Sequence, residues 1–566
     1  MHRTVPILAG IRKIGLAAFA ALVFSLPATG QTLIARQDMK DFDIEAIPFP
    51  FESYALQGSS LYIPHPVMLQ VADGAFVMVY INEKDKLRER RIERYNLLLE
   101  LEWSQVFEIE NNEEILELIK TDSSVVVISR RDGLAGETAR VEVRKFNLDT
   151  GEPSPVFTLT SDSKVSDFIV SVSPDSSRIA VFSFHSNNEL QRAKIFYDYL
   201  LTDDRLAYQV SWVEDVKFQL FDRELHPLES GTIRVRENGE RFLSYAVRHC
   251  GVDNEGRIFV GVHRKKTDLQ MYRWEKGKTA DLIYTHFIKL HEFADVFNTH
   301  LPPLLHQGNA YWAMADREKK GWKKGTRAFE VIKFDFGQSM ADVSLKAPIT
   351  SSLLVQVEKS RETFGIKPLR NFDQFRIRGM FALGDTSIWL VTQYFEFRDS
   401  APINYGEPYN RNVRGAGDQR VCEMILYEFD ASNRARQAII VPSLQYIRDP
   451  YSAGSRFTHF WLEPETGNLR LLAWEPSKPD LKGPERIHYK QVSLGGGTLT
   501  PRKIFYEGRR RTQYLLPPYI CWLSGGHVAM MALDGDGGRP YLLTLRVEEG
   551  NADFDAELHN SKENWR

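Results

Sequence analysis

Residues 253–262 read DNEGRIFVGV, a tight polar turn followed at once by an apolar run rich in β-branched residues. A short turn directly before such a run is typical of a β-hairpin. The pattern recurs along the chain, with eight turns at residues 73–74, 122–124, 174–177, 253–256, 307–309, 384–386, 464–468 and 524–526. A second hairpin follows each first one, as in KFNLDTGEP at 145–153 and YEFDASNRA at 427–435. Four hairpin-linked strands, repeated eight times, are typical of the blades of a β-propeller.

The repeat therefore predicts an all-β chain that forms a single eight-bladed β-propeller of four-stranded antiparallel blades over residues 65–566. Seven or nine blades would result if the long third and sixth units were merged or split. Residues 31–64 are expected to be an N-terminal extension that packs on the propeller or completes a blade. A β-sandwich, or two unrelated β domains, is the alternative, because short strands with turns occur there too. The regular order of the turns favours the propeller.

One repeat carries a family resemblance. Residues 173–184 read SPDSSRIAVFSF and resemble the WD-like repeat of propellers related to the Tol-system periplasmic propeller, where a Ser-Pro-Asp turn leads into an Ile-Ala-Phe strand. The other units share the period and the turn chemistry. The resemblance implies the fold of a secreted bacterial propeller of unassigned family. It implies no activity, because propellers include binding proteins and enzymes alike.

The N-terminus predicts export. Arg3, Arg12 and Lys13 form a basic region, and an apolar run at residues 16–26 leads to small residues at 28–30. This pattern is that of a signal peptide over residues 1–30, with cleavage expected between Gly30 and Gln31. The apolar run is shorter than the roughly 18 residues that a membrane anchor needs. We therefore expect a secreted or periplasmic protein without a transmembrane segment.

Charge and cysteine content narrow the class of protein. The formal net charge is −3, whereas nucleic-acid-binding proteins usually carry a clear basic excess, so no nucleic-acid partner is expected. The three cysteines, Cys250, Cys422 and Cys521, are too sparse for a disulfide framework. Two of them fall on first strands of units four apart, and the other falls on a third strand. We therefore expect three free thiols.

The connections between second and third strands are expected to be long and to share one face with the connections between blades. Binding residues often develop on such loops. The fifth-blade loop, DREKKGWKKGTR at residues 316–327, has six basic residues against two acids. Basic side chains beside aromatic ones suit anionic polymers or sugars, although charged loops are also ordinary solvated surface. The candidate ligand-binding residues are Arg130, Arg131, His263, Arg264, Lys265, Lys266, Lys319, Lys320, Trp322, Lys323, Lys324, Tyr405, Tyr409, Arg411 and Arg414.

Catalytic and metal-binding motifs are weak. Residues 337–341 fall one residue short of the G-x-S-x-G motif of α/β-hydrolases. His286, His291 and His300 are the weak metal candidates, but Asp295 stands where an H-E-x-x-H motif needs its second His. No cofactor is expected. The sequence favours an exported binding platform for a protein or an anionic polymer or glycan. The alternatives are a polysaccharide hydrolase or lyase with its site at the central channel, and an envelope assembly component.

Overall fold

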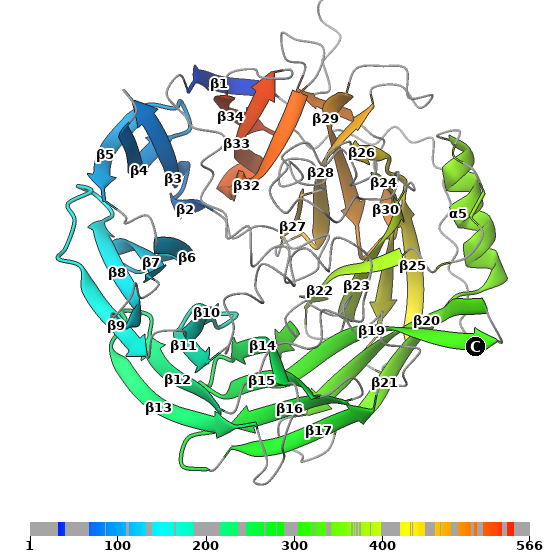
Figure 1. The fold of residues 1–566 in the computed structure, drawn as a ribbon. Coiled ribbons are helices and arrows are strands. Elements are labelled where there is room, and N and C mark those ends of the chain that lie inside the picture. The colour runs from blue at the N-terminus through cyan, green and yellow to red at the C-terminus, as the bar shows by residue number, and fades with distance from the viewer. Residues whose placement is uncertain are drawn as a thin grey trace, which may run out of the picture.

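The computed structural model describes residues 32–39 and, with gaps at several connections, residues 67–547. The longest gaps within the second range are residues 186–214, 398–418 and 288–303. The strands form eight antiparallel sheets, arranged as blades around one axis (Figure 1). The prediction of eight four-stranded blades is confirmed. The predicted signal peptide lies outside the described residues and stays a prediction.

Each blade runs outward from a first strand beside the axis. Blades 1 and 2 comprise β2 (Met68–Ala72), β3 (Ala75–Lys84), β4 (Leu87–Asn96) and β5 (Leu101–Phe107), then β6 (Glu113–Lys120), β7 (Ser124–Arg131), β8 (Ala139–Asn147) and β9 (Phe157–Asp162). Blades 3 and 4 comprise β10 (Ser166–Val172), β11 (Arg178–His185), β12 (Asp215–Asp222) and β13 (Pro227–Arg234), then β14 (Tyr245–Val252), β15 (Ile258–Arg264), β16 (Asp268–Trp274) and β17 (Asp281–Phe287).

The second half of the ring repeats this order, with additions. Blade 5 comprises β18 (Leu304–His306), β19 (Asn309–Lys320), β20 (Lys323–Asp335) and β21 (Ala341–Pro348). Blade 6 comprises β22 (Phe375–Leu383), β23 (Ser387–Phe397), β24 (Gln419–Phe429) and β25 (Ala435–Val441), with β26 (Gln445–Ile447) also on β24. Blade 7 comprises β27 (His459–Glu463), β28 (Asn468–Pro476), β29 (Glu485–Ser493), β30 (Thr498–Leu499) and β31 (Lys503–Tyr506). Blade 8 contains β32 (Gln513–Leu523), β33 (His527–Asp534) and β34 (Pro540–Arg546).

The predicted first turns join the first and second strands, and their residues explain the tight geometry. In blade 4 the amide of Gly256 donates to the carbonyl of Asp253 at 3.0 Å. Gly256 has a φ of 82°, a left-handed conformation that glycine adopts without steric cost. The Asp253 carboxylate also accepts from the amide of Glu255 at 3.1 Å, as turn aspartates commonly do. The turn chemistry read from the sequence is therefore the chemistry that closes the hairpin.

The core lies between the blades, because each strand presents alternate residues to its two neighbouring blades. On β7, Val125 and Val127 pack in one apolar cluster with blade 1, whereas Val126 and Ile128 pack in another with blade 3. All four side chains are buried. Both faces of a blade are thus apolar over their inner half, which explains the near-continuous apolar runs in the sequence.

The chain closes the ring with its first strand. β1 (Thr32–Asp38) pairs antiparallel with β34, and Thr32 lies opposite Arg546. Blade 8 therefore takes three strands from the end of the chain and its outermost strand from the beginning (Figure 1). This pairing places the N-terminal segment at residues 32–38 inside the propeller rather than before it.

One helix interrupts the repeat. α5 (Ser351–Thr363) follows blade 5 and lies on the outside of the ring (Figure 1). Leu353 and Val357 are buried in the cluster shared with blade 6. Arg361, at the last turn, donates to Glu423 on β24 at 2.9 Å. Within the described residues, no helix is long and apolar enough to cross a membrane.

The three cysteines lie on the strands that the sequence predicts. Cys250 lies on β14 and Cys521 on β32, which are first strands of blades 4 and 8, and Cys422 lies on the third strand β24. All three are buried, and no disulfide joins any two of them.

Candidate functional site

The predicted binding residues that the structure describes lie where second strands end and third strands begin. Arg130 and Arg131 end β7, and His263 and Arg264 end β15. Lys319 and Lys320 end β19, and Lys323 and Lys324 begin β20. We call this end of the propeller the long-connection face, and the opposite end, with the first turns, the turn face. Seven candidates lie outside the described residues: Lys265, Lys266, Trp322, Tyr405, Tyr409, Arg411 and Arg414.

The fifth-blade segment expected as a loop is mostly strand. β19 and β20 remain paired from Asn309 opposite Asp335 out to Lys320 opposite Lys323, with one register shift between Asp316 and Arg317. They have 12 and 13 residues and are the longest strands that the structure describes. Strand pairing joins backbone amides and carbonyls, so a charged sequence does not prevent it. Polarity alone therefore misidentified this segment as a loop.

The register of this ribbon opposes like charges. Lys319 pairs with Lys324, and Lys320 pairs with Lys323. Like charges directly opposite each other destabilise a β-ribbon. The acid that precedes them, Glu318, lies opposite Gly325 rather than opposite a lysine. The tip of the β19–β20 hairpin therefore has no carboxylate directly across from its four lysines.

Two other hairpins of the long-connection face show the opposite arrangement. In blade 1, Glu83 lies opposite Arg88. In blade 4, Arg264 lies opposite Asp268. Opposite charges at such positions favour the pairing. Each of these two hairpins thus places an acid opposite an arginine. The blade 5 hairpin differs from them in which charges lie opposite each other, and not only in its number of basic residues.

The blade 2 arginines lie among acids of their own blade. Arg130 pairs with Glu114, and Arg131 with Glu113, across β6 and β7. Deeper in this blade Arg144 contacts Glu113, with 2.5 Å between Nη1 and Oε1. The acids of blade 2 offset the positive charge of these arginines, whereas no acid lies directly opposite the lysines at the tip of the β19–β20 hairpin.

The metal candidates do not come together in the described part of the chain. His286 is on β17, the outermost strand of blade 4, where it pairs with Leu269. His291 and His300 lie outside the described residues. Among the described residues, no group of three His, Cys, Asp or Glu side chains is placed to hold a metal ion.

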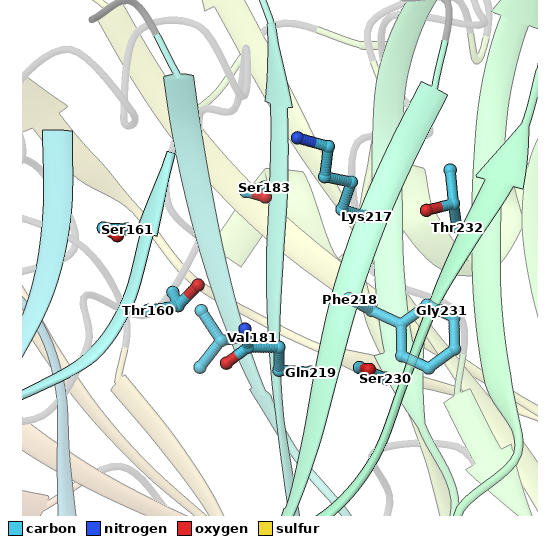
Figure 2. Close-up of a pocket in the computed structure, with 10 residues that line it drawn as sticks. All are labelled: Thr160, Ser161, Val181, Ser183, Lys217, Phe218, Gln219, Ser230, Gly231 and Thr232. Carbon is cyan, nitrogen blue, oxygen red and sulfur yellow. The ribbon is translucent and has the colours of Figure 1, made fainter. Parts of the chain in front are cut away.

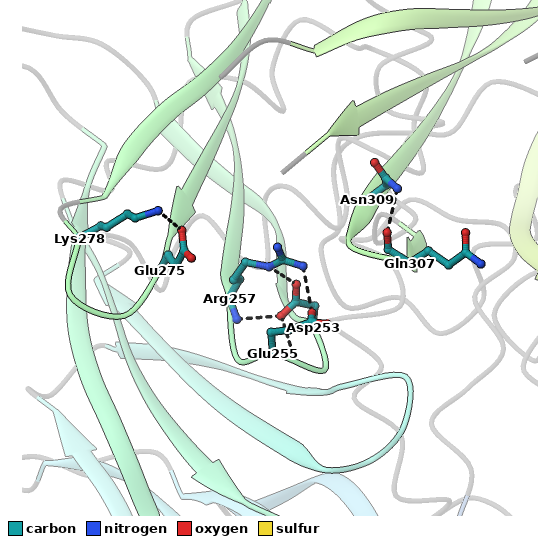
Figure 3. A network of polar contacts seen from close by, with 7 residues as sticks. All are labelled: Asp253, Glu255, Arg257, Glu275, Lys278, Gln307 and Asn309. Atoms are coloured by element: carbon teal, nitrogen blue, oxygen red, sulfur yellow. Dashed lines mark hydrogen bonds and ion pairs between the residues drawn. The ribbon is translucent and has the colours of Figure 1, made fainter. Parts of the chain in front are cut away.

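On the turn face, two turns of blade 4 carry charges that are matched within the turn (Figure 3). Arg257 Nε donates to Asp253 at 2.6 Å, and its Nη2 donates to Glu255 at 2.9 Å. Nearby, Lys278 donates to Glu275 at 2.6 Å. These contacts stabilise the hairpin turns, and they leave this part of the turn face with little charge for a partner.

The strands beside the axis present partly exposed apolar side chains. Leu69 on β2, Ile169 on β10 and Phe460 on β27 are examples from three blades. Glu463, at the end of β27, contacts Arg470, with 2.6 Å between Oε1 and Nη2. A pair of carboxylates at the axis would favour a polysaccharide-cleaving enzyme. The described inner strands are apolar in these places, and β6 also carries the partly exposed Glu117.

Sequence reasoning missed a polar groove between blades 2 and 3. The groove has a volume of about 260 Å³ and includes Lys217, Gln219 and Ser183 of blade 3 and Thr160 of blade 2 (Figure 2). Its side chains come from strands that look, in sequence, like ordinary half-exposed strands. That these polar side chains lie together becomes apparent only when the register of the neighbouring strands is known.

The comparisons with known proteins find distant structural likenesses only. No protein-family model matches the sequence. No curated protein matches it either. The C-terminal WD40 domain of Sif2 has a TM-score of 0.42 at 8% identity, covering 92% of this chain and 99% of that one. The polysaccharide lyase Uly1 gives 0.39 at 11%, covering 92% and 98%. The propeller domain of the Trilobed protease from Pyrococcus furiosus gives 0.34 at 12%, covering 79% and 97%. Likenesses this distant carry no argument about activity.

Proposed function

We propose that the protein is an exported binding platform, and that the tip of the β19–β20 hairpin binds an anionic polysaccharide on the long-connection face. The observation that carries the proposal is the register, which sets Lys319 opposite Lys324 and Lys320 opposite Lys323. Because these pairs repel, an anion that approaches them relieves the repulsion as well as forming ion pairs. The lysine pairs should therefore destabilise the hairpin when it is unbound, and an anion bound to them should offset that cost.

The neighbouring sequence supports a polysaccharide rather than a small anion. In the sequence, Trp322 follows Lys319 and Lys320 and precedes Lys323 and Lys324. An aromatic side chain with basic ones before and after it suits a polymer that carries both negative charge and flat apolar faces. The signal-peptide pattern at residues 1–30 supports export, which would bring the propeller to extracytoplasmic polysaccharides. The experiment must distinguish an anionic polysaccharide from an acidic protein surface as the partner.

The test uses the chain from Gln31 onward and three immobilised probes: polygalacturonate, dextran sulfate and neutral dextran. We expect the two acidic polymers to bind and the neutral one not to bind. Binding should weaken steeply with added salt, because exposed charges are screened over about 8 Å at physiological ionic strength. Replacing the four hairpin lysines by Ala should abolish most binding without lowering the melting temperature, since surface changes usually cost within about 0.5 kcal/mol.

A matched control removes four exposed positive charges from other blades. Their side chains are 59% to 78% exposed, and the set is Arg234, Lys276, Lys278 and Arg436. This control should bind the acidic polymers as the parent does. If both quadruple variants lose binding equally, attraction is diffuse and the hairpin is no site. If neither acidic polymer binds the parent, the polysaccharide proposal is wrong, and an acidic protein becomes the partner to seek.

A further inference from the structure

The outermost strand of blade 3 has an open edge. β13 pairs with β12 on one side, and within the described residues no strand pairs with its other side. Figure 1 shows β13 at the outer rim of the ring. An edge strand directs alternate backbone N–H and C=O groups away from its sheet, where an added strand can bond them. β13 thus presents a row of backbone donors and acceptors at the surface.

The middle of β13 lacks the features that commonly protect an edge strand, which are proline, bulges and charged side chains. Pro227 begins the strand, and the register with β12 shifts near that end, between Leu220 and Phe221. From Ser230 to Ile233 the register is regular, and no side chain in this stretch is charged. The protective features are therefore confined to the flanks of the strand.

The charges that flank this stretch are matched by neighbouring side chains. Glu229 forms an ion pair with Lys276 of blade 4. At the other end, Arg234 Nε lies 3.7 Å from Asp215 Oδ1 on β12. A peptide that pairs with β13 would therefore meet little net charge from these two positions. This arrangement favours an uncharged peptide over an acidic or a basic one.

Gly231 lies in the middle of the open edge. A Cβ on this residue would lie 2.5 Å from Cζ of Phe218, which stands directly opposite on β12. Figure 2 shows the Phe218 ring beside Gly231. Glycine is therefore required here by the packing within blade 3. Glycine in a strand often also marks a place where another backbone can approach closely, and its neighbours Ser230 and Thr232 are small and exposed.

Two hollows follow each other along this strand. The polar groove is lined by β13 from Ser230 to Thr232, and by Thr160 and Ser161 of blade 2. An outer hollow of about 380 Å³ is lined by β13 from Pro227 to Ser230. The two hollows are thus offset by about two residues along β13. Successive side chains on one face of an extended peptide have the same spacing.

The hollows differ in the side chains that they suit. Their volumes of about 260 and 380 Å³ lie near the low end of the roughly 300–1,000 Å³ typical of sites for drug-sized ligands, so each suits a single side chain. The outer hollow includes Leu228, which is 42% exposed. The polar groove instead presents the hydroxyl groups of Thr160, Ser161 and Thr232. The outer hollow therefore favours an apolar side chain, and the polar groove a small hydroxyl-bearing one.

We propose that the outer edge of β13 binds an extended, uncharged peptide of a partner protein, which adds a fifth strand to blade 3. The peptide runs antiparallel to β13, because antiparallel pairing is slightly more stable per residue. Its main chain bonds the open edge, and two alternate side chains enter the polar groove and the outer hollow. Strand addition of this kind takes affinity from main-chain hydrogen bonds and specificity from pockets for alternate side chains. This surface is separate from the tip of the β19–β20 hairpin in blade 5.

The experiment titrates a fluorophore-labelled heptapeptide, TSVTTLT with both ends blocked, with the chain from Gln31 onward and follows fluorescence anisotropy. In the antiparallel register the serine is placed for the polar groove and the leucine for the outer hollow. Two isomers carry N-methyl groups on the amides of peptide positions 2, 4 and 6 or of positions 3, 5 and 7. One set of amides faces β13 and the other faces solvent. We therefore expect one isomer to bind like the unmodified peptide and the other to bind about tenfold more weakly or worse.

A charged edge should block the peptide. Replacing Ser230 and Thr232 by Lys adds the protection that natural edge strands use, and should weaken binding about tenfold or more. Both positions are exposed, so the melting temperature should not change. The matched control adds two lysines to β5, the outermost strand of blade 1, at Leu101 and Val106, which are 52% and 51% exposed. This control should bind the peptide like the parent.

The proposal is overturned if the parent does not bind the peptide, if the two methylated isomers bind alike, or if the β13 lysine variant binds like the parent. It is also overturned if maltotriose displaces the peptide, because the hollows would then be a sugar site. The methylated peptides need no change in the protein, so misfolding of a variant cannot hide the answer. The four-lysine hairpin variant should bind the peptide like the parent, and this surface and the polysaccharide site can therefore fail separately.

Discussion

Arg36 in the first strand lies over Tyr541 in the last, with 3.9 Å between its guanidinium carbon and the centroid of the ring. The two residues are 505 positions apart in sequence, and their contact fastens the seam of the propeller ring. Met39, just beyond β1, extends the same seam, because its amide donates to the carbonyl of Pro540 at 2.9 Å. Closure of the ring therefore depends on a short segment at residues 32–39.

Weakening this seam should lower the stability of the whole ring. Arg36→Ala should lower the free energy of unfolding by about 0.5–2 kcal/mol, the range of a cation–π contact. Deleting residues 32–38 should cost more, because it exposes the edge of β34 and the side chains packed beneath it. Urea unfolding followed by tryptophan fluorescence measures both, with Arg234→Ala at an exposed site as the control. Deletion without loss of stability would mean that the ring does not need β1.

A buried histidine should make the stability depend on pH. Burial lowers the pKa of His459 to about 4, and Trp522 Nε1 donates to its Nδ1 at 3.5 Å. Between pH 6.5 and 4 the unfolded chain binds a proton that the folded protein does not, so stability present above pH 6.5 is lost as pH falls. From pH 7 to pH 5 this group should contribute a loss of about 2 kcal/mol. His459→Gln should show a correspondingly flatter dependence in denaturant titrations at the two pH values, and an equal dependence would contradict the assignment.

The effects on stability of substitutions at Arg361 of α5 and Glu423 of blade 6 should depend strongly on each other, because the two side chains form an ion pair. Arg361 and Glu423 are both buried, and Arg361 also lies 4.4 Å from the ring centroid of Tyr394. Glu423→Leu alone should cost about 3–5 kcal/mol, because it leaves a buried charge unmatched. Adding Arg361→Met should restore part of this loss. A double-mutant cycle by chemical unfolding tests it, and additive losses would show that the two side chains do not interact.

The thiols should be unreactive until the protein unfolds. Burial raises the pKa of the Cys521 thiol to about 12 and also raises that of Cys250. Because the thiolate is the reactive form, a disulfide reagent at pH 8 should modify the native protein only slowly. Unreduced protein in denaturant should release three equivalents. Fewer than three would reveal a disulfide that the buried, separate positions exclude.

The fold was largely predictable because its signals are local. The turn at Gly256 combines a left-handed glycine with an aspartate that accepts backbone hydrogen bonds, and both features can be read within a few residues. The seam between Arg36 and Tyr541 has no local signal, because its two strands lie at opposite ends of the chain. The sequence accordingly leaves the role of residues 31–64 open. It does not indicate α5 either, because this helix is an insertion outside the repeat and its buried residues Leu353 and Val357 pack against blade 6.

The candidate sites were predictable to different degrees. Charge counting pointed to Lys319 and its neighbours, but it could not reveal that they oppose each other, because that depends on register. The groove at Lys217 was missed for a related reason. On β12, Lys217 and Gln219 alternate with buried Phe218 and Leu220, as in any strand with one wet face. The opposite wall of the groove comes from Thr160 and Ser161 of blade 2, which no pattern on β12 indicates.

The blade 5 hairpin offers a test in which stability and binding move in opposite directions. Replacing Lys323 and Lys324 by Glu would set an acid opposite each of Lys320 and Lys319, as Glu83 stands opposite Arg88 in blade 1. Cross-strand pairs contribute about 0.2–1 kcal/mol, so this variant should be as stable as the parent or slightly more stable. Its binding to polygalacturonate should nevertheless be lost, because the tip becomes neutral. Differential scanning calorimetry and the polymer-binding assay measure the two effects. A variant that keeps its binding would show that the lysines do not contact the polymer, and one that melts much earlier would show that the lysine pairs have a structural role.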